Sequence, residues 1–180
     1  MIKNSYKKNL YIVEGKIEKK FIEELKTHNL IKLGKCAEFN LMQKKIKKTN
    51  NIMSKTYNEI FCIIDTDCVE DCNLQNLYDN IKFLRSVGKV KVFVQCRNFE
   101  EELAYILELK SSDIILSLCK YLELKNKTKD DLKDFLAKNI IYIKYINEEN
   151  LKKYCSRPEA FEKLLKEKIN IVNGINLLVR

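Results

Sequence analysis

The segment that most constrains the fold is residues 59–64, which read EIFCII and form an apolar run that ends at Asp65. A short run of β-branched and aromatic residues favours a strand, and the lack of polar alternation indicates that both faces of this strand are covered. Strands of this kind are typical of parallel sheets with helices on either side. We therefore expect an α/β fold.

The rest of the first half alternates between strand and helix patterns. We predict strands at 9–13 (NLYIV), 35–41 (KCAEFNL), 59–64 and 90–94, and helices at 17–30, 42–54, 74–87 and 98–109. This alternation predicts a mostly parallel sheet that is flanked by helices and joined by right-handed crossovers.

From Ser111 onward the pattern is mostly helical. Helices are predicted at 112–123, 128–138, 147–155 and 157–168, and a short apolar run spans 140–143. We expect residues 1–110 to form the α/β core and residues 111–180 to form a helical extension packed on it. The length of 180 residues suits a single domain.

The chain is basic, because 34 Lys and Arg residues face 25 Asp and Glu residues and leave a net charge of +9. A basic surface attracts polyanions such as nucleic acid. The densest cluster is Lys44, Lys45, Lys47 and Lys48, which we predict to contact nucleic acid. Richness in Lys, Ile and Asn is also typical of AT-rich genomes, so part of the charge has a second explanation that needs no partner.

The composition indicates a protein of the cytoplasm. No run approaches the roughly 18–20 apolar residues of a membrane span, and residues 1–10 lack an apolar signal core. The seven cysteines are an odd number, and Cys62 and Cys96 lie in apolar runs, so we expect reduced thiols. Cys68 and Cys72 have poor zinc spacing. The single histidine, His28, is expected at the surface.

The first acidic cluster follows the first predicted strand and reads VEGKIE. Stepping the next helix by about 100° per residue places Glu18 inside the apolar arc, between Leu25 and Ile22. Gly15 lies where the strand must turn sharply and where backbone can approach a ligand. A carboxylate on a buried stripe needs a cation or a donor. Alternatively, both residues have structural roles: Glu14 caps the start of the helix by a favourable interaction with the helix dipole, and Glu18 pairs with a nearby lysine.

The second cluster, Asp65-Thr66-Asp67, follows the predicted strand at 59–64. Because side chains alternate along a strand, residues two apart point to the same side, and two carboxylates meet at the edge where α/β sheets bind ligands. Such oxygen ligands suit Mg²⁺ or Mn²⁺. Aspartates also begin turns and cap helices, so a structural role stays open.

The third cluster, residues 98–102 (NFEEE), follows the strand at 90–94. The same helical stepping places Glu100 toward the apolar arc, points Glu101 away from it and leaves Glu102 near its other edge. Acidic residues also belong in the first turn of any helix. Taken together, the three clusters place carboxylates at the ends of three strands of one sheet, which predicts a metal site.

Glu14-Gly15 after the first strand and Asp65-x-Asp67 after a later strand resemble the signature of the TOPRIM domain. This domain is shared by topoisomerases, primases, OLD-type nucleases and small ribosomal-RNA-maturing nucleases. Residues 98–100 are similar to a segment of the RloB-like subfamily, prokaryotic proteins linked to phage defence. The resemblance covers about residues 9–110 and implies a TOPRIM-like, Rossmann-like sheet.

The resemblance implies Mg²⁺- or Mn²⁺-dependent hydrolysis of phosphodiester bonds in nucleic acid, with a role in anti-phage defence. Asp65 and Asp67 would hold metal, and Glu14 would ligate a second metal or act as general base. Glu18 and Glu100 would complete or orient the ligand shell.

The resemblance also suggests partners. Lys16 lies close enough in sequence to contact phosphate, although a surface lysine is the simpler interpretation. The lysine cluster at residues 44–48 would hold the nucleic-acid backbone. A protein partner, such as an ATPase encoded nearby, is a further expectation.

Two other functions stay open. The first is a non-catalytic TOPRIM-like subunit that binds nucleic acid or protein within a defence complex. The second is a haloacid-dehalogenase-type phosphatase, which also uses a DxD motif. In that family the motif follows the first strand, whereas Asp65 and Asp67 follow a later one.

Overall fold

The computed structural model describes residues 8–47, 56–66, 71–95, 97–110, 112–125, 127–139, 146 and 148–154. These residues form a four-stranded parallel sheet in the order β2-β1-β3-β4. The strands are β1 (Asn9–Val13), β2 (Gly34–Glu38), β3 (Glu59–Ile64) and β4 (Lys89–Val94). The expected α/β class and mostly parallel sheet are thereby confirmed.

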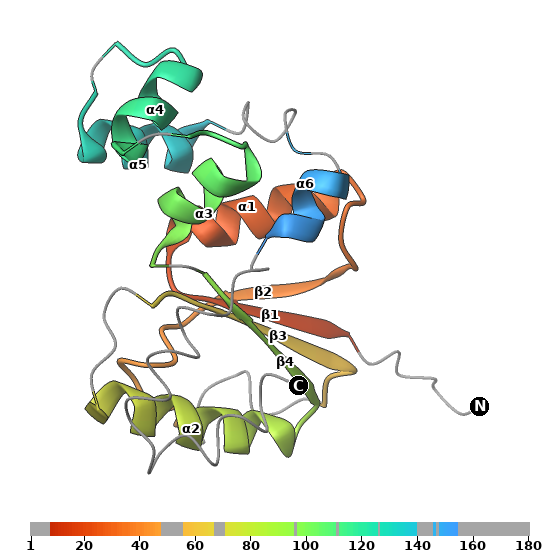
Figure 1. The fold of residues 1–180 in the computed structure, drawn as a ribbon. Coiled ribbons are helices and arrows are strands. Elements are labelled where there is room, and N and C mark those ends of the chain that lie inside the picture. The colour runs from red at the N-terminus through yellow and green to blue at the C-terminus, as the bar shows by residue number, and fades with distance from the viewer. Residues whose placement is uncertain are drawn as a thin grey trace.

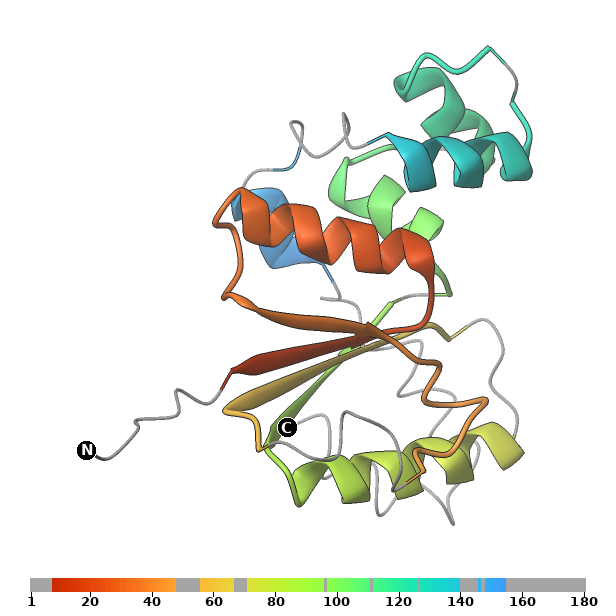
Figure 2. The ribbon, with the colours of Figure 1, turned by 180° about the vertical axis from the view of Figure 1, so that it is seen from behind.

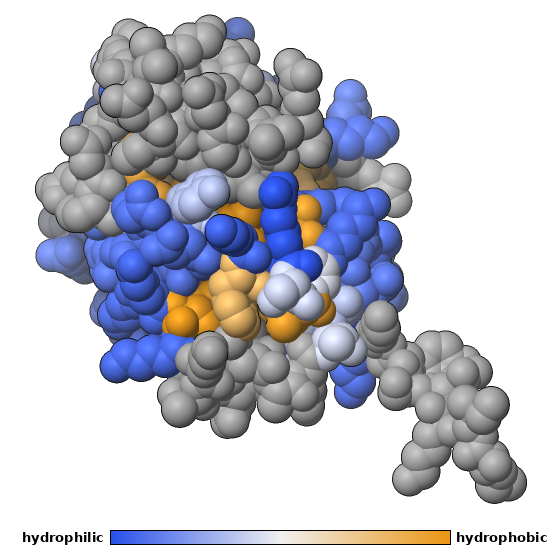
Figure 3. All heavy atoms as spheres, turned by 90° about the horizontal axis from the view of Figure 1, so that it is seen from below, coloured by the Kyte–Doolittle hydropathy of each residue, from blue (hydrophilic) through white to orange (hydrophobic). Residues whose placement is uncertain are grey.

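The described helices cover both faces of this sheet. They are α1 (Lys16–Thr27), α2 (Asp71–Arg85), α3 (Phe99–Ile106), α4 (Ile114–Tyr121), α5 (Lys129–Lys138) and α6 (Glu148–Lys153). Helix α2 lies on one face, and α1, α3 and α6 lie on the other, with α4 and α5 beyond α3 (Figures 1 and 2). On the side seen from below, hydrophilic residues surround a smaller apolar area (Figure 3).

Alternation along the strands divides the core into two layers. Leu10 and Ile12 of β1 pack in the layer with α2, whereas Tyr11 and Val13 pack in the layer with α1, α3, α4 and α5. All six residues of β3 are buried, as expected for a strand covered on both faces. The expectation drawn from the EIFCII run is therefore confirmed.

The helix predicted at 42–54 is wrong over its described part, because residues 42–47 form a turn and irregular backbone. One turn starts at Asn40, whose carbonyl accepts from Lys44 N. The Asn80 side chain then makes the hydrogen bonds that backbone groups would make in a helix. Its Oδ1 accepts from Ile46 N at 2.8 Å, and its Nδ2 donates to Leu41 O and Lys44 O. Residues 48–54 lie outside the described part.

The other bounds shift by a few residues. The second strand ends at Glu38 instead of residue 41, because Asn40 begins the turn. The first helix ends at Thr27, and Asn29 follows with a φ of 57°. Helices α4, α5 and α6 fall within the predicted ranges, whereas the predictions for 140–143 and 157–168 lie outside the described residues.

The C-terminal helices share one apolar layer with the sheet. Leu118 of α4 and Leu132 and Leu136 of α5 are fully buried in the same cluster as Phe21 of α1. Lys20 Nζ donates to Ala137 O at 2.8 Å and ties α1 to the end of α5. Within the described residues, no helix is long and apolar enough to cross a bilayer.

Three cysteines with described side chains, Cys36, Cys62 and Cys119, are buried free thiols. Burial raises the pKa of Cys36 to about 11 and also raises the pKa of Cys62. These thiols are therefore protonated near neutral pH and pack as apolar side chains. The side chains of the other four cysteines lie outside the described part.

Candidate functional site

The strand order creates a switch point between β1 and β3. The chain leaves β1 through α1 to reach β2 on one side, and it leaves β3 through α2 to reach β4 on the other side. The helices α1 and α2 lie on opposite faces of the sheet, and in open α/β sheets the carboxyl ends of the strands at such a switch point are where ligands bind. Glu14 follows β1 and Asp65 follows β3, so both residues lie at these strand ends.

Glu14 joins the ends of three strands. Its Oε1 accepts from the backbone N–H of Asp65 at 3.3 Å, and its Oε2 accepts from Asn40 Nδ2 at 2.7 Å. Asn40 is itself held, because its Oδ1 accepts from Met42 N at 3.0 Å and Gln43 N at 2.9 Å. The Glu14 carboxylate is thus held in position by a hydrogen bond to each of its two oxygens.

Asn40 was missed by the sequence reasoning, which placed it inside a strand. An asparagine that leaves a strand often accepts hydrogen bonds from backbone two or three residues later, and this tendency was the available signal.

The middle residue of the DxD motif has a structural role. Thr66 is buried, its Oγ1 donates to Gln95 O at 3.1 Å, and it accepts from Arg97 N at 2.8 Å. Arg97 has a φ of 66°, a conformation that costs energy for a residue other than glycine. The ends of β3 and β4 are thereby held together directly beside Asp65. Asp67 lies outside the described residues.

Gly15 does not need to be glycine for its backbone conformation. Its φ of −135° is in the extended region, so its backbone requires no glycine. A Cβ at this position would lie 2.8 Å from Oε2 of Glu18. The glycine therefore leaves room for the Glu18 carboxylate to fold back over the start of α1.

Glu18 and Glu100 are inward carboxylates, as the helical stepping predicted. Their exposed fractions are 8% and 4%. Burial raises the pKa of Glu18; its own backbone N–H opposes this effect, and the negative charges of Glu100 and Glu38 add to it. A positive charge acts in the opposite direction, that of Lys133 of α5, whose Nζ lies 3.8 Å from Oε1 of Glu100.

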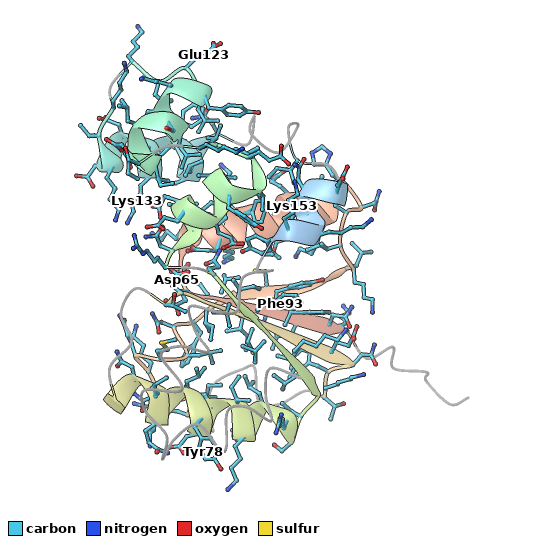
Figure 4. The ribbon with its side chains drawn as sticks, viewed as in Figure 1. Asp65, Tyr78, Phe93, Glu123, Lys133 and Lys153 are labelled. Atoms are coloured by element: carbon cyan, nitrogen blue, oxygen red, sulfur yellow. The ribbon has the colours of Figure 1, made fainter. Side chains whose placement is uncertain are left out.

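Figure 4 shows Asp65 at the ends of the strands and Lys133 above it on α5. A lysine of the C-terminal extension thus reaches the acidic start of α3. Lys133 could not be linked to the site from sequence, because no local pattern indicates which face of a later helix meets α3.

The first turn of α3 differs from expectation at one residue. Asn98 caps the helix by accepting from Glu101 N at 3.0 Å, and Glu101 pairs with exposed Arg97 at 3.3 Å. Glu102 is fully buried, although the arc placed it only near an edge. Apolar residues of α4 and α6 pack on α3 in addition to the sheet. The buried surface of α3 is therefore wider than the single apolar arc that the sequence indicates.

The carboxylates are chemically suited to a hard divalent cation. Carboxylate oxygens are the preferred ligands of Mg²⁺ and Mn²⁺, and Glu14 and Asp65 supply them from adjacent strands. Among the described residues, no group of three or more His, Cys, Asp or Glu side chains is close enough to hold a metal ion. The set predicted from sequence also includes Asp67, which is not described.

The described lysines of the predicted basic cluster, Lys44, Lys45 and Lys47, are exposed. Lys45 pairs with Asp79 of α2 at 2.7 Å, and this neighbour lowers the pKa of the aspartate. Lys16 is also exposed, at the first turn of α1 beside Gly15. His28 is exposed, as predicted. Lys48 lies outside the described residues.

Comparison of the chain with protein-family models, with curated protein sequences and with solved structures found no match.

Proposed function

We propose that the protein is a divalent-metal-dependent nuclease of the TOPRIM type, which hydrolyses phosphodiester bonds of nucleic acid. The observation that carries the proposal is the contact between Glu14 and the backbone of Asp65 across the switch point of the sheet. Ligands of open α/β sheets bind at such a point. Acidic residues that follow two neighbouring parallel strands supply oxygen ligands that suit a divalent cation.

The proposed roles follow from position. Glu14, Asp65 and Asp67 would hold Mg²⁺ or Mn²⁺, which when bound stabilises the charge of the attacking and leaving oxygens. Asn40 and the Asp65 N–H orient the Glu14 carboxylate.

Glu18 and Glu100 are proposed to orient the ligand shell from the layer of α1 and α3. The raised pKa of Glu18 favours its protonated form, which can donate a hydrogen bond. Exposed Lys16, Lys44 and Lys47 supply positive charge for the phosphate backbone.

The first test measures Mg²⁺ and Mn²⁺ binding by calorimetry, and then cleavage of single- and double-stranded DNA and RNA. Glu14→Gln and Asp65→Asn are compared with wild type, and Glu101→Gln is the matched control because it removes one charge outside the proposed ligand set. We expect both site variants to weaken metal binding and to slow cleavage by about 100-fold or more, as for loss of a catalytic carboxylate. The control should keep both properties.

The outcomes separate the candidate functions. Cleavage that is unchanged in Glu14→Gln and Asp65→Asn would overturn this assignment of the site. Metal and nucleic-acid binding without cleavage of any substrate would support a non-catalytic binding subunit instead. Hydrolysis of small phosphomonoesters without cleavage of nucleic acid would indicate a phosphatase.

A further inference from the structure

A pocket separate from the candidate site lies on the sheet in the layer of α1 and α6, with a volume of about 270 Å³. Its floor includes Tyr11, Phe61 and Phe93 from the three adjacent strands β1, β3 and β4. Figure 4 shows Phe93 within the sheet, where it pairs with Ile63, whereas Asp65 lies beyond the end of β3. The pocket is therefore separate from the carboxylates at the strand ends.

The floor of this pocket is aromatic. The rings of Tyr11 and Phe61 stack with centroids 4.7 Å apart and planes 13° apart, and Phe93 lies 6.1 Å from Phe61. The walls include the aliphatic side chains of Ile22, Leu25 and Ile31. An aromatic body gains offset or edge contacts with such rings, and the volume is enough for one or two rings.

Among the described residues that line the pocket, two are charged, and both are lysines, Lys32 and Lys91. Each is tied to a different oxygen of the same carboxylate, because Glu59 Oε2 lies 2.6 Å from Lys32 Nζ and Oε1 lies 2.7 Å from Lys91 Nζ. Two ammonium groups thus share one carboxylate. Lys32, Lys91 and Glu59 together carry a net charge of about +1. The lysine side chains are 63% and 42% exposed, so both can reach a ligand at the mouth.

The described residues deeper in the pocket offer few polar partners. The Tyr11 hydroxyl already donates to Lys32 O at 2.8 Å, and the Tyr154 hydroxyl accepts from Gln95 Nε2 at 2.7 Å. A nucleobase would bury its amide and amine edges against aliphatic walls at a cost in free energy. A ligand with an apolar body and a single anionic group avoids this cost.

We propose that this pocket binds a small aromatic carboxylate, with its ring system on the Tyr11–Phe61–Phe93 floor and its carboxylate between Lys32 and Lys91. The ring would fill the apolar volume, and the carboxylate would meet the net positive charge at the mouth. Pockets that combine apolar walls with a few placed charged groups are typical small-molecule sites.

The test uses 2-naphthoate as the probe and 2-naphthylmethanol as its neutral counterpart. Binding of each is measured by calorimetry on the full chain, and chemical shifts of the isoleucine methyl groups locate the site by NMR. We expect saturable binding of 2-naphthoate with shifts at Ile22 and Ile31, and clearly weaker binding of the alcohol. Absence of saturable 2-naphthoate binding, or shifts confined to other parts of the molecule, would overturn the proposal.

Two matched pairs of variants test the parts separately. Lys91→Gln should weaken 2-naphthoate binding by about two- to fivefold, as for a half-exposed ion pair, whereas Lys89→Gln makes the same charge change on the same strand at an exposed position outside the lining. Ile31→Trp should fill the pocket and abolish binding, whereas Leu33→Trp adds the same residue at a 73% exposed position and should not.

Equal binding of the acid and the alcohol would overturn the role of the lysines. Unchanged binding in Ile31→Trp would overturn the placement of the ring. If Ile31→Trp does not fold, the methyl shifts of the wild-type protein decide the placement without it.

Discussion

The carboxylate of Glu18 occupies the space that a side chain at position 15 would need, which favours glycine there. Gly15 has an extended backbone that any residue can adopt, and only the 2.8 Å between a Cβ and Glu18 Oε2 disfavours a side chain there. The two positions should therefore be coupled in energy, as residues in contact usually are.

The coupling can be measured with a double-mutant cycle of Gly15→Ala and Glu18→Ala. We expect Gly15→Ala alone to destabilise the protein by about 1 kcal/mol, because the carboxylate must leave its position, and to be neutral or stabilising in the Glu18→Ala background. Denaturant unfolding gives the four free energies. Equal effects of Gly15→Ala in both backgrounds would contradict the contact.

Burial of Glu18 also predicts a dependence of stability on pH. Because its pKa is raised in the folded protein above the ordinary 4.5, the folded state binds the proton more tightly than the unfolded state. The contribution of Glu18 is then most favourable below pH 4.5 and declines as the pH rises through the folded pKa. Glu18→Gln should therefore stabilise the protein at pH 7 but give little difference at pH 4.

Thermal unfolding of Glu18→Gln at both pH values tests this expectation. Glu24→Gln serves as the control, since Glu24 is only partly buried on the same helix. A midpoint for Glu18→Gln below that of wild type at pH 7 would show that the buried charge is stabilising, contrary to the argument.

At the scale of elements, the hydrophobic patterns identified the strands and helices of the core. Burial of one face gives apolar residues a regular spacing in the sequence, and burial of both faces gives a continuous apolar run. These patterns failed at residues 42–47, where the side chain of Asn80 takes the backbone groups that a helix would use. That contact joins residues 34 positions apart, and no local window contains it.

The carboxylates of the candidate site were predicted for a similar reason. Glu14, Glu18, Asp65 and Glu100 each stand at a recognisable end of an element, so their shared edge followed from the topology of a parallel sheet. Asn40 and Lys133 were not predicted, because their positions depend on a loop and on a packed helix that local patterns do not place.

The loop at 40–47 should depend on Asn80 for its structure. Asn80 is 2% exposed and makes hydrogen bonds to three backbone groups of the loop. Asn80→Ala leaves these groups unsatisfied and should cost about 2–4 kcal/mol in the free energy of unfolding. Asn76→Ala loses its bond to Met42 O at a less buried position and should cost about 1 kcal/mol. Urea unfolding compares the two; equal costs would contradict this account.

At the scale of the whole molecule, the helical extension and the sheet share one core. Leu132 of α5 is fully buried in the cluster that contains Phe21 and Phe61. Replacing Leu132 with Ala should therefore destabilise β3 as well as α5, by about 2–5 kcal/mol for a large-to-small change in a core.

Amide hydrogen exchange measures both regions in one experiment. We expect the slowest amides of β3 to lose protection by the same free energy as those of α5, because they open in one global unfolding step. Leu33→Ala, at a 73% exposed position, should leave both unchanged. Loss of protection confined to α4 and α5 would identify the extension as a separate folding unit.

The pairing of β1 with β3 also bears on how quickly the protein can fold. Glu14 and Asp65, which meet at the switch point, are 51 residues apart in the chain, and α1, β2 and the loop at 40–47 all lie within the segment that must close. Contacts of such long sequence separation form slowly, because the entropy of loop closure is lost before the contacts are gained. The two central carboxylates are thus brought together only when the chain has completed its most distant strand pairing, so a partly folded chain carries the helices of this protein without its candidate site.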